Sequence, residues 1–332
     1  MRYAPHVVER GPGIRFMDMR AEVEAAAERI RPYVRETPVE ESRALGRAGG
    51  ARVYMKMENL QATGSFKLRG AMNKLLSLTP AERAGGVVTA SSGNHGAAVA
   101  CGLEALRIPG VIYVPENASP AKVANIRSYG AEVRTHATDS GLTEIFARRY
   151  ARDNGRTYIS PYNDPVVVAG QGTIGPELAR QLESVDTLFV ALGGGGLITG
   201  IAGYLKETGR RVDVVACSPE NSAVMHHSVR AGRILEMEST PTLSDGTAGA
   251  VEPGAITLDL CRTYVDRYVL VSEEEIKEGM RLVIDHHHTL VEGAAGVAVA
   301  GYLKEKERCA GRNVVIVLCG GNISRDRLKE IL

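Results

Sequence analysis

Tryptophan is absent from this sequence of 332 residues, and only 5% of the residues are aromatic. The five cysteines are scattered, with no CxxC pair, so neither a disulfide framework nor a zinc cluster is expected, and a reducing cytoplasm fits best. No apolar run reaches the roughly 18 to 20 residues that a membrane span needs. The formal net charge of +1 lacks the excess expected for a nucleic-acid or acidic-membrane partner.

The chain is long enough to bury a substantial core, divided over two domains or lobes. Residues 1–17 contain several Gly and Pro and lack the apolar core of a signal peptide. We therefore expect them to form an extension on the surface. No linker followed by a second compact unit is found, so we expect no regulatory domain.

Short β-branched runs alternate with longer amphipathic stretches along most of the chain. This alternation predicts βαβ units and an α/β fold with largely parallel sheets. The run at 187–192 is apolar almost throughout, as expected when helices cover both faces of a strand. The predicted strands are residues 53–56, 86–90, 111–114, 132–135, 187–192, 212–217, 267–271 and 313–318, and the predicted helices are residues 21–33, 67–77, 96–106, 142–154, 175–182, 274–286 and 297–307.

Glycine-rich turns follow three of these strands, at residues 91–96, 193–196 and 319–322. Ligands of open α/β sheets bind outside the carboxyl ends of the strands. We therefore expect the three turns to face one cleft.

The four consecutive glycines at 193–196 lie between a strand and a helical pattern that starts at Ile198. Such a turn lets backbone N–H groups converge on an anion at a helix N-terminus. The sequence is neither GxGxxG nor a P-loop, which favours a single phosphate group over a dinucleotide or a nucleoside triphosphate. A turn that serves only tight packing is the alternative.

Lys67 follows Phe66 at the predicted start of a helix. Taken alone, it is typical of a solvated lysine; a functional lysine must be partly desolvated or near positive charge, so that a neutral amine can form a Schiff base. The turn SSGNHG at 91–96 suits a carboxylate by the helix-dipole argument, although its Ser and Asn also suit helix capping. His95 alone is as typical of a structural histidine as of a functional one.

Six motifs occur in order along the chain: GSFKLRGA, SSGNHG, AGQGTIGPE, GGGGL, VEGAAG and LCGGN. Together they resemble the fold-type II pyridoxal-phosphate enzymes, the family of threonine and serine dehydratases (ammonia-lyases) and serine racemase. The resemblance covers the chain from about Asp18 onward. It implies a tryptophan synthase β-like fold of two lobes, each with a mostly parallel sheet flanked by helices, and pyridoxal 5'-phosphate as cofactor.

The resemblance further implies a large cofactor-binding domain, residues 1–55 and 155–332, and a small domain, residues 56–154, that holds the loop for the substrate carboxylate. Homodimers are the family expectation. The partner is a small-molecule amino acid.

Each motif acquires a role from the resemblance. Lys67 would carry the cofactor as a Schiff base and act as base on Cα–H, and Ser92 matches the serine that serine racemase uses on the opposite face of the substrate. Asn94 would bind the ring hydroxyl, and Cys319 would face the pyridine nitrogen, where a neutral thiol favours prompt loss of a β-leaving group. The cofactor-binding residues would be Phe66, Lys67, Asn94, Gly193, Gly194, Gly195, Gly196, Leu197, Gly246 and Cys319. The substrate carboxylate would be received by Ser91, Ser92, Asn94 and His95.

The implied reaction is dehydration and then deamination of a β-hydroxy-α-amino acid such as L-threonine or L-serine, giving a 2-keto acid and ammonia. The segment 218–247 resembles hydroxyectoine-utilisation and phenylserine-type dehydratases, which leaves a bulkier β-substituted serine open. Alternatives are an amino-acid (serine) racemase, a β-replacement enzyme, and a metabolite-binding regulator in which Lys67 is idle.

Many members of this family bind a divalent cation on acidic residues after the strand that corresponds to 212–217. Ser218 and Val224 stand at two of those positions here, and hard cations need several oxygen ligands. We therefore predict no metal site, with only Glu220 leaving the matter open. The consecutive histidines 286–288 point in different directions on a helix and are predicted to be structural, as are His226 and His227.

Overall fold

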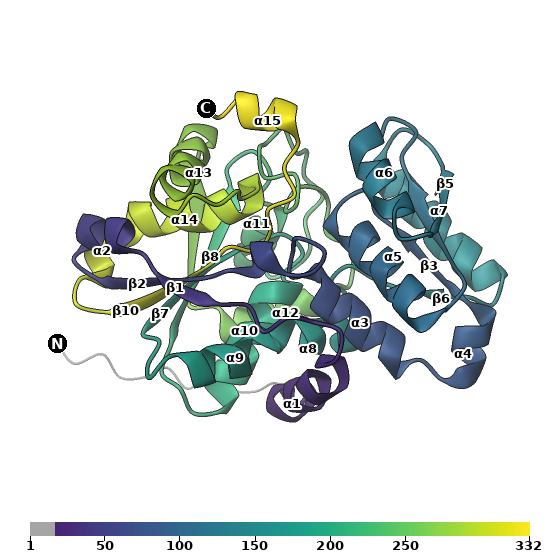
Figure 1. Ribbon diagram of the computed structural model, residues 1–332, viewed down its shortest axis with the longest axis horizontal. Helices are drawn as coiled ribbons and strands as arrows, with labels where there is room; N and C mark the ends of the chain where they lie inside the picture. Colours follow the sequence, from purple (N-terminus) through teal and green to yellow (C-terminus); the bar gives the residue numbers. More distant parts are fainter. Residues whose placement is uncertain (1–16) are drawn as a thin grey trace.

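The computed structural model describes residues 17–332, which form an α/β fold with two sheets (Figure 1). The larger sheet has the strand order β1-β2-β10-β7-β8-β9, and the smaller has the order β5-β4-β3-β6. All neighbouring strands are parallel except β1 and β2, which pair antiparallel. Of the N-terminal segment predicted to lie on the surface, residues 1–16 lie outside the described part of the chain.

The ten strands of the described chain are β1 (Val39–Glu41), β2 (Arg52–Lys56), β3 (Val87–Ala90), β4 (Gly110–Val114), β5 (Glu132–Thr135), β6 (Thr157–Tyr158), β7 (Thr187–Ala191), β8 (Asp213–Pro219), β9 (Arg267–Val271) and β10 (Asn313–Val317). The helices are α1 (Met19–Ile30), α2 (Arg43–Gly49), α3 (Lys67–Ser77), α4 (Pro80–Gly85), α5 (Asn94–Leu106), α6 (Pro120–Arg127), α7 (Ser140–Asp153), α8 (Pro165–Gly172), α9 (Ile174–Gln181), α10 (Gly196–Glu207), α11 (Val224–Ala231), α12 (Ile256–Tyr264), α13 (Glu273–His287), α14 (Gly293–Glu305) and α15 (Arg325–Lys329), with short 3-10 turns η1 (Glu58–Leu60) and η2 (Lys306–Cys309).

The larger sheet is covered on both faces, as its apolar strands require. Every residue of β7 is buried, and strands of this kind belong to sheets with helices on both sides. α14 packs against β7, β8, β9 and β10, while α10 packs against β7. Figure 1 shows α13 and α14 on one side of this sheet and α9 and α10 on the other.

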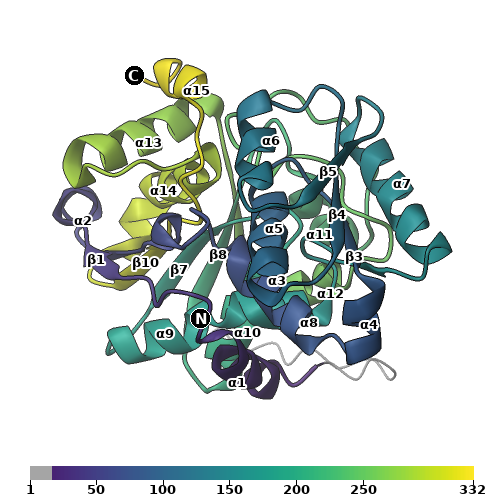
Figure 2. The ribbon, with the colours of Figure 1, turned by 45° about the vertical axis from the view of Figure 1, so that its right-hand side comes forward.

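The smaller sheet stands beside the larger one and comes from one stretch of chain, with α5, α6 and α7 packed around it (Figure 2). α3 lies between the two sheets, where it packs against α5 and α8. This helix, which begins at Lys67, therefore contacts helices that belong to both sheets.

The predicted α/β class with parallel, helix-flanked sheets is confirmed, and each predicted strand is present within two residues of its expected bounds. The strands β1 and β6 were not predicted, because three and two residues are too short to show an alternating pattern. The lobe boundary at 154 stays a prediction, and β6 of the smaller sheet lies just beyond it.

Candidate active site

Lys67 lies at the first position of α3, half-buried between the two sheets. Its Nζ donates a hydrogen bond to the carbonyl oxygen of Pro161 at 2.9 Å and stands 5.1 Å from the centre of the Phe66 ring. Desolvation lowers the pKa of the amine to about 8, although Cys319 and Glu292 oppose the shift. More neutral amine therefore exists near neutral pH than for an ordinary lysine, and a nucleophilic or basic lysine requires this form.

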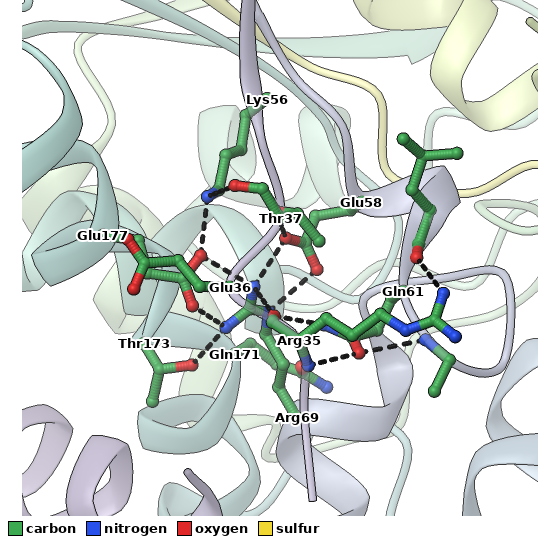
Figure 3. A network of polar contacts seen from close by, with 12 residues as sticks. Arg35, Glu36, Thr37, Lys56, Glu58, Gln61, Arg69, Gln171, Thr173 and Glu177 are labelled. Atoms are coloured by element: carbon green, nitrogen blue, oxygen red, sulfur yellow. Dashed lines mark hydrogen bonds and ion pairs between the residues drawn. The ribbon is translucent and has the colours of Figure 1, made fainter.

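A buried ion network anchors the first turn of α3 (Figure 3). Arg69, two residues after Lys67, is fully buried and bonds Glu58 through Nε and Nη2 at 2.8 and 2.7 Å. Its Nη1 and Nη2 also bond Glu177 at 2.6 and 2.9 Å, and Lys56 donates to Glu177 at 2.6 Å. Because two-point arginine–carboxylate pairs fix orientation, the network ties α3 to β2, η1 and α9.

Cys319 follows β10 and runs alongside the turn that precedes Lys67. The Phe66 N–H donates to the Cys319 carbonyl at 3.0 Å, and Ser65 forms an antiparallel bridge with Gly320. Burial raises the pKa of the Cys319 thiol well above its usual value. The thiol is therefore neutral at physiological pH.

The glycine turn at 193–196 joins β7 to α10 and leaves no room for side chains. A Cβ on Gly194 would overlap the ring of Tyr162, and Gly195 has φ +88°, in the left-handed region that favours glycine. α10 has no side-chain cap at its N-terminus, so the free amides of its first turn have no competing side-chain acceptor. The turn is a cradle for an anion.

Further contacts shape this cradle. A Cβ on Gly193 would lie 2.9 Å from the Thr247 Cα, and Leu197 is buried in the first turn of α10. Thr257 lies on the other side, with its buried Oγ1 3.6 Å from where a Cβ on Gly195 would stand. That hydroxyl has no hydrogen-bond partner. A free buried hydroxyl beside an amide-lined turn fits a phosphate group.

The turn at 91–96 joins β3 to α5. Ser91 and Ser92 are partly exposed, and the Ser91 Oγ accepts a hydrogen bond from the Gly93 N–H at 3.2 Å. No side chain caps α5, so the alternative in which the Ser and Asn of this turn serve helix capping does not hold; the Asn94 side chain bonds Glu292 instead. The amides of this N-terminus are thereby available to an anion.

His95 is buried in the first turn of α5, with its Nε2 3.2 Å from the carbonyl oxygen of Ile159. Its Nδ1 has no partner. Burial, together with Lys67, lowers the pKa of the ring to about 3. The imidazole is therefore neutral and cannot serve as a cationic anchor.

Asn94 connects several motifs. Its Nδ2 donates to both carboxylate oxygens of Glu292, at 2.8 and 3.0 Å, and its Oδ1 accepts from the Asn322 Nδ2 at 2.7 Å. Gly246 adjoins the same carboxylate, since a Cβ there would lie 3.4 Å from the Glu292 Oε1. The contacts thus bring together segments that the sequence separates by about two hundred residues.

Some of the histidines contact neighbouring side chains, and one ends a helix. His287 shares a hydrogen bond of 2.7 Å with the Ser42 Oγ, His288 ends α13 with φ 51°, and His226 is buried against Tyr268. No group of three His, Cys, Asp or Glu side chains that could hold a metal ion occurs within residues 17–332. The prediction about the cation near Glu220 stays a prediction. Within the same residues, no helix is long and apolar enough to cross a bilayer.

Sequence reasoning missed three parts of this site: the ring of Tyr162 against the glycine turn, the Asn94–Glu292 contact, and the network around Arg69. The only sequence signal was position, because Glu292 and Arg69 lie inside the motifs VEGAAG and GSFKLRGA. Neither motif says which distant side chain each residue meets.

Residues 30–320 match the family model described as "Pyridoxal-phosphate dependent enzyme". The chain belongs to this family. The glycine turn and the desolvated Lys67 amine agree with that membership, and the cofactor is pyridoxal 5'-phosphate.

Particular relatives are similar over nearly the whole chain. The L-threonine ammonia-lyase of Thermotoga maritima is 38% identical over 311 residues, 94% of this chain and 77% of that protein. The L-threo-3-hydroxyaspartate ammonia-lyase of Saccharomyces cerevisiae is 36% identical over 307 residues, 92% of this chain and 94% of that protein. The crystal structure of serine racemase from Dictyostelium discoideum matches with a TM-score of 0.84 and 32% identity, covering 92% of this chain and 98% of that one.

Proposed function

We propose that this protein is an ammonia-lyase that dehydrates and then deaminates a β-hydroxy-α-amino acid, with Lys67 as the residue that carries the cofactor. The observation that supports this most is the Lys67 amine, desolvated at the start of α3 beside a neutral Cys319. A threonine ammonia-lyase and a hydroxyaspartate ammonia-lyase among the relatives support the same reaction class.

Several residues would hold the cofactor. The backbone amides of Gly193, Gly194, Gly195, Gly196 and Leu197 would receive its phosphate, and Phe66 would pack against its ring. Asn94 would hydrogen-bond the ring hydroxyl, Cys319 would face the ring nitrogen, and Gly246 would line the pocket. When bound, the cofactor withdraws electrons from the Cα of the substrate. A neutral thiol opposite the nitrogen limits that withdrawal, which suits rapid loss of a β-hydroxyl.

The chain's own groups would position the substrate and move its α-proton. Ser91, Ser92 and Asn94 would receive the substrate carboxylate at the N-terminus of α5, where the helix amides are free. His95 would contribute as a neutral hydrogen-bonding group, in keeping with its lowered pKa. Lys67 would accept the proton from Cα, because its pKa of about 8 keeps part of the amine unprotonated at neutral pH.

The preferred substrate is L-threonine or L-serine, and the similarity to the threonine ammonia-lyase supports it. An alternative substrate is a bulkier β-substituted serine, as in phenylserine-type or hydroxyectoine-related dehydratases. The similarity to the yeast hydroxyaspartate ammonia-lyase makes hydroxyaspartate a further candidate substrate. Formation of 2-keto acid across these amino acids would rank them. The proposal would be contradicted if none of these amino acids gave a 2-keto acid.

Replacing Lys67 with Ala tests the catalytic assignment. We expect the visible absorption of the cofactor–lysine Schiff base to disappear and keto-acid formation to fall by about 10²–10⁴-fold or more. Lys74→Ala is the matched control, because Lys74 lies on the same helix but pairs with Asp164 at 2.7 Å. An unchanged spectrum in Lys67→Ala would refute the proposal.

Amino-acid racemisation is the second candidate, favoured by the similarity to serine racemase and by Ser92 beside the N-terminus of α5. Deuterium exchange at Cα followed by chiral analysis separates the two activities. We expect keto acid to exceed the opposite enantiomer as product, and any racemisation to be lost in Ser92→Ala.

We further propose a homodimer and a cytoplasmic location. The five cysteines, all without disulfides, support a reducing compartment. The two lobes, divided as the sequence predicts, would close over the substrate and exclude water.

A further inference from the structure

Hydrogen bonds connect three motif segments, and the turn before Lys67, in one chain that has Asn322 as its first donor. The Asn322 Nδ2 donates to the backbone carbonyl of Thr63 at 2.9 Å and to the Asn94 Oδ1 at 2.7 Å. The Asn94 Nδ2 then donates to Glu292 at 2.8 and 3.0 Å. Thr63 lies before Lys67, so the chain runs from the lysine turn, through two asparagines, to the start of α14.

Every direction in this chain follows from its first member. A backbone carbonyl can only accept, so the end of the Asn322 amide that faces Thr63 must be the nitrogen. The same nitrogen donates to Asn94, which turns the Asn94 oxygen toward Asn322 and its nitrogen toward Glu292. Glu292 must accept at that position, and a carboxylate accepts at both oxygens.

The Glu292 carboxylate accepts hydrogen bonds from Asn94 and does not cap its own helix. Glu292 occupies the N-cap position of α14 but makes no capping bond there, so its carboxylate is directed to Asn94. The side chain is buried, and a Cβ on Gly320 would lie 2.6 Å from the Glu292 Oε1. Glycine at position 320 therefore makes room for the carboxylate in the site.

We propose that Glu292 is a positioning residue of this active site: its carboxylate fixes the orientation of the Asn94 amide, and its protonation releases that orientation. The inference rests on the proposed function, in which Asn94 faces the cofactor ring hydroxyl. A protonated carboxyl has one acceptor oxygen fewer, while the Asn94 Nδ2 can only donate. Taking up one proton from solvent therefore removes one of the two bonds that hold the amide.

Several neighbouring groups raise or lower the pKa of Glu292. Burial raises the pKa of Glu292 to about 7, whereas the bonds from Asn94 lower it. Asp245, in the loop between α11 and α12, raises this pKa, and Lys122 of α6 lowers it. Lys67 and Cys319 also face the carboxylate, which raises the pKa of both.

The variants Glu292→Gln and Glu292→Ala, studied as holoenzymes, test the inference. Gln keeps an acceptor for Asn94 but does not titrate, whereas Ala removes the acceptor as well. In the wild type we expect an absorption change of the bound cofactor with a midpoint near pH 7, together with a protonated-carboxyl infrared band that vanishes over the same range. Glu292→Gln should lose both transitions and bind pyridoxal phosphate within about threefold of wild type; Glu292→Ala should bind it about tenfold more weakly.

A Glu292→Gln holoenzyme that keeps both transitions would overturn the inference, as would a folded Glu292→Ala variant with wild-type cofactor affinity. Thermal melting checks that each variant folds, and the Gln variant decides alone if Ala does not. These failures differ from failure of the proposed function, because the Schiff-base spectrum and its loss in Lys67→Ala would remain.

Discussion

At the residue scale, the chemistry of the site depends on buried titratable groups, because burial disfavours the charged form of each group. The Lys67 amine loses part of its positive charge, the His95 ring is neutral and the Cys319 thiol keeps its proton. Each shift has the sign that desolvation dictates for its group. Lys67 is the member of this set whose protonation changes near physiological pH.

The pH dependence of the apoenzyme follows from Lys67. The folded pKa of about 8 is below the ordinary value of 10.5, so between these values the unfolded chain binds more protons. We therefore expect the unfolding free energy to rise with pH from about 8 to 10.5. The rate of Schiff-base formation with added pyridoxal phosphate should rise with a midpoint near pH 8. Denaturant unfolding and stopped-flow absorbance measure the two, with Lys67→Ala as control; a midpoint near 10.5 would contradict the assignment.

At the scale of single elements, α3 is held by a charged cluster as well as by apolar packing. Arg69 and Glu58 are fully buried, and Glu177 is nearly so. Arg69 faces both carboxylates while Lys56 shares one of them, so the cluster is balanced in charge (Figure 3). Balance of this kind is what makes a buried charge tolerable.

Replacing Arg69 with Met should lower the unfolding free energy by about 3–5 kcal/mol, because it leaves two buried carboxylates without their arginine. Chemical denaturation measures the loss. The exposed Arg20, paired with Glu24 on α1, provides the control, and Arg20→Met should change stability by less than about 0.5 kcal/mol. The double variant Arg69→Met/Glu58→Gln should recover part of the loss; if Arg69→Met is as stable as wild type, the network does not anchor α3.

The sequence alone could predict the approximate strand ends and the parallel sheets, because these follow from motifs and other local patterns. It could not predict that Glu292 meets Asn94, since the two are 198 positions apart and the motif VEGAAG does not indicate which distant side chain its glutamate contacts. Likewise, GSFKLRGA shows that Arg69 is present but gives no sign that its partners come from η1 and α9. Pairings across the fold are fixed by packing, which one sequence does not display.

At the scale of the whole molecule, the loop between α11 and α12 links the surroundings of the two sheets by ion pairs. Arg148 of α7 meets Glu252 at 2.5 Å, and Lys122 of α6 meets Asp245. Glu252 is further held through its N–H, which donates to the Tyr162 hydroxyl at 2.9 Å. The loop thus reaches helices of the smaller sheet from a chain segment that belongs to the larger one.

Glu252→Ala should loosen this loop. We expect amide hydrogen exchange across residues 244–256 to accelerate by about three- to tenfold, because the substitution removes the part-exposed ion pair with Arg148 and the hydrogen bond that the Asn163 Nδ2 donates to the Glu252 carboxylate. Exchange in α10 should not change. Asp153→Asn, which removes the exposed pair with Arg152, is the control. Unaltered exchange in the loop would show that the pair does not restrain it.

The chain leaves the larger sheet after β2 and returns to it at β7, and everything in the smaller sheet is built in between. The smaller sheet is therefore formed by one continuous segment of the chain, which also contains the SSGNHG turn. The glycine turn at 193–196 and Cys319 lie outside that segment. Exchange of a single gene segment between relatives would transplant the turn proposed to receive the substrate and leave the cradle in place. If this turn receives the substrate as proposed, recombination as well as point substitution would change the amino acid that the enzyme accepts.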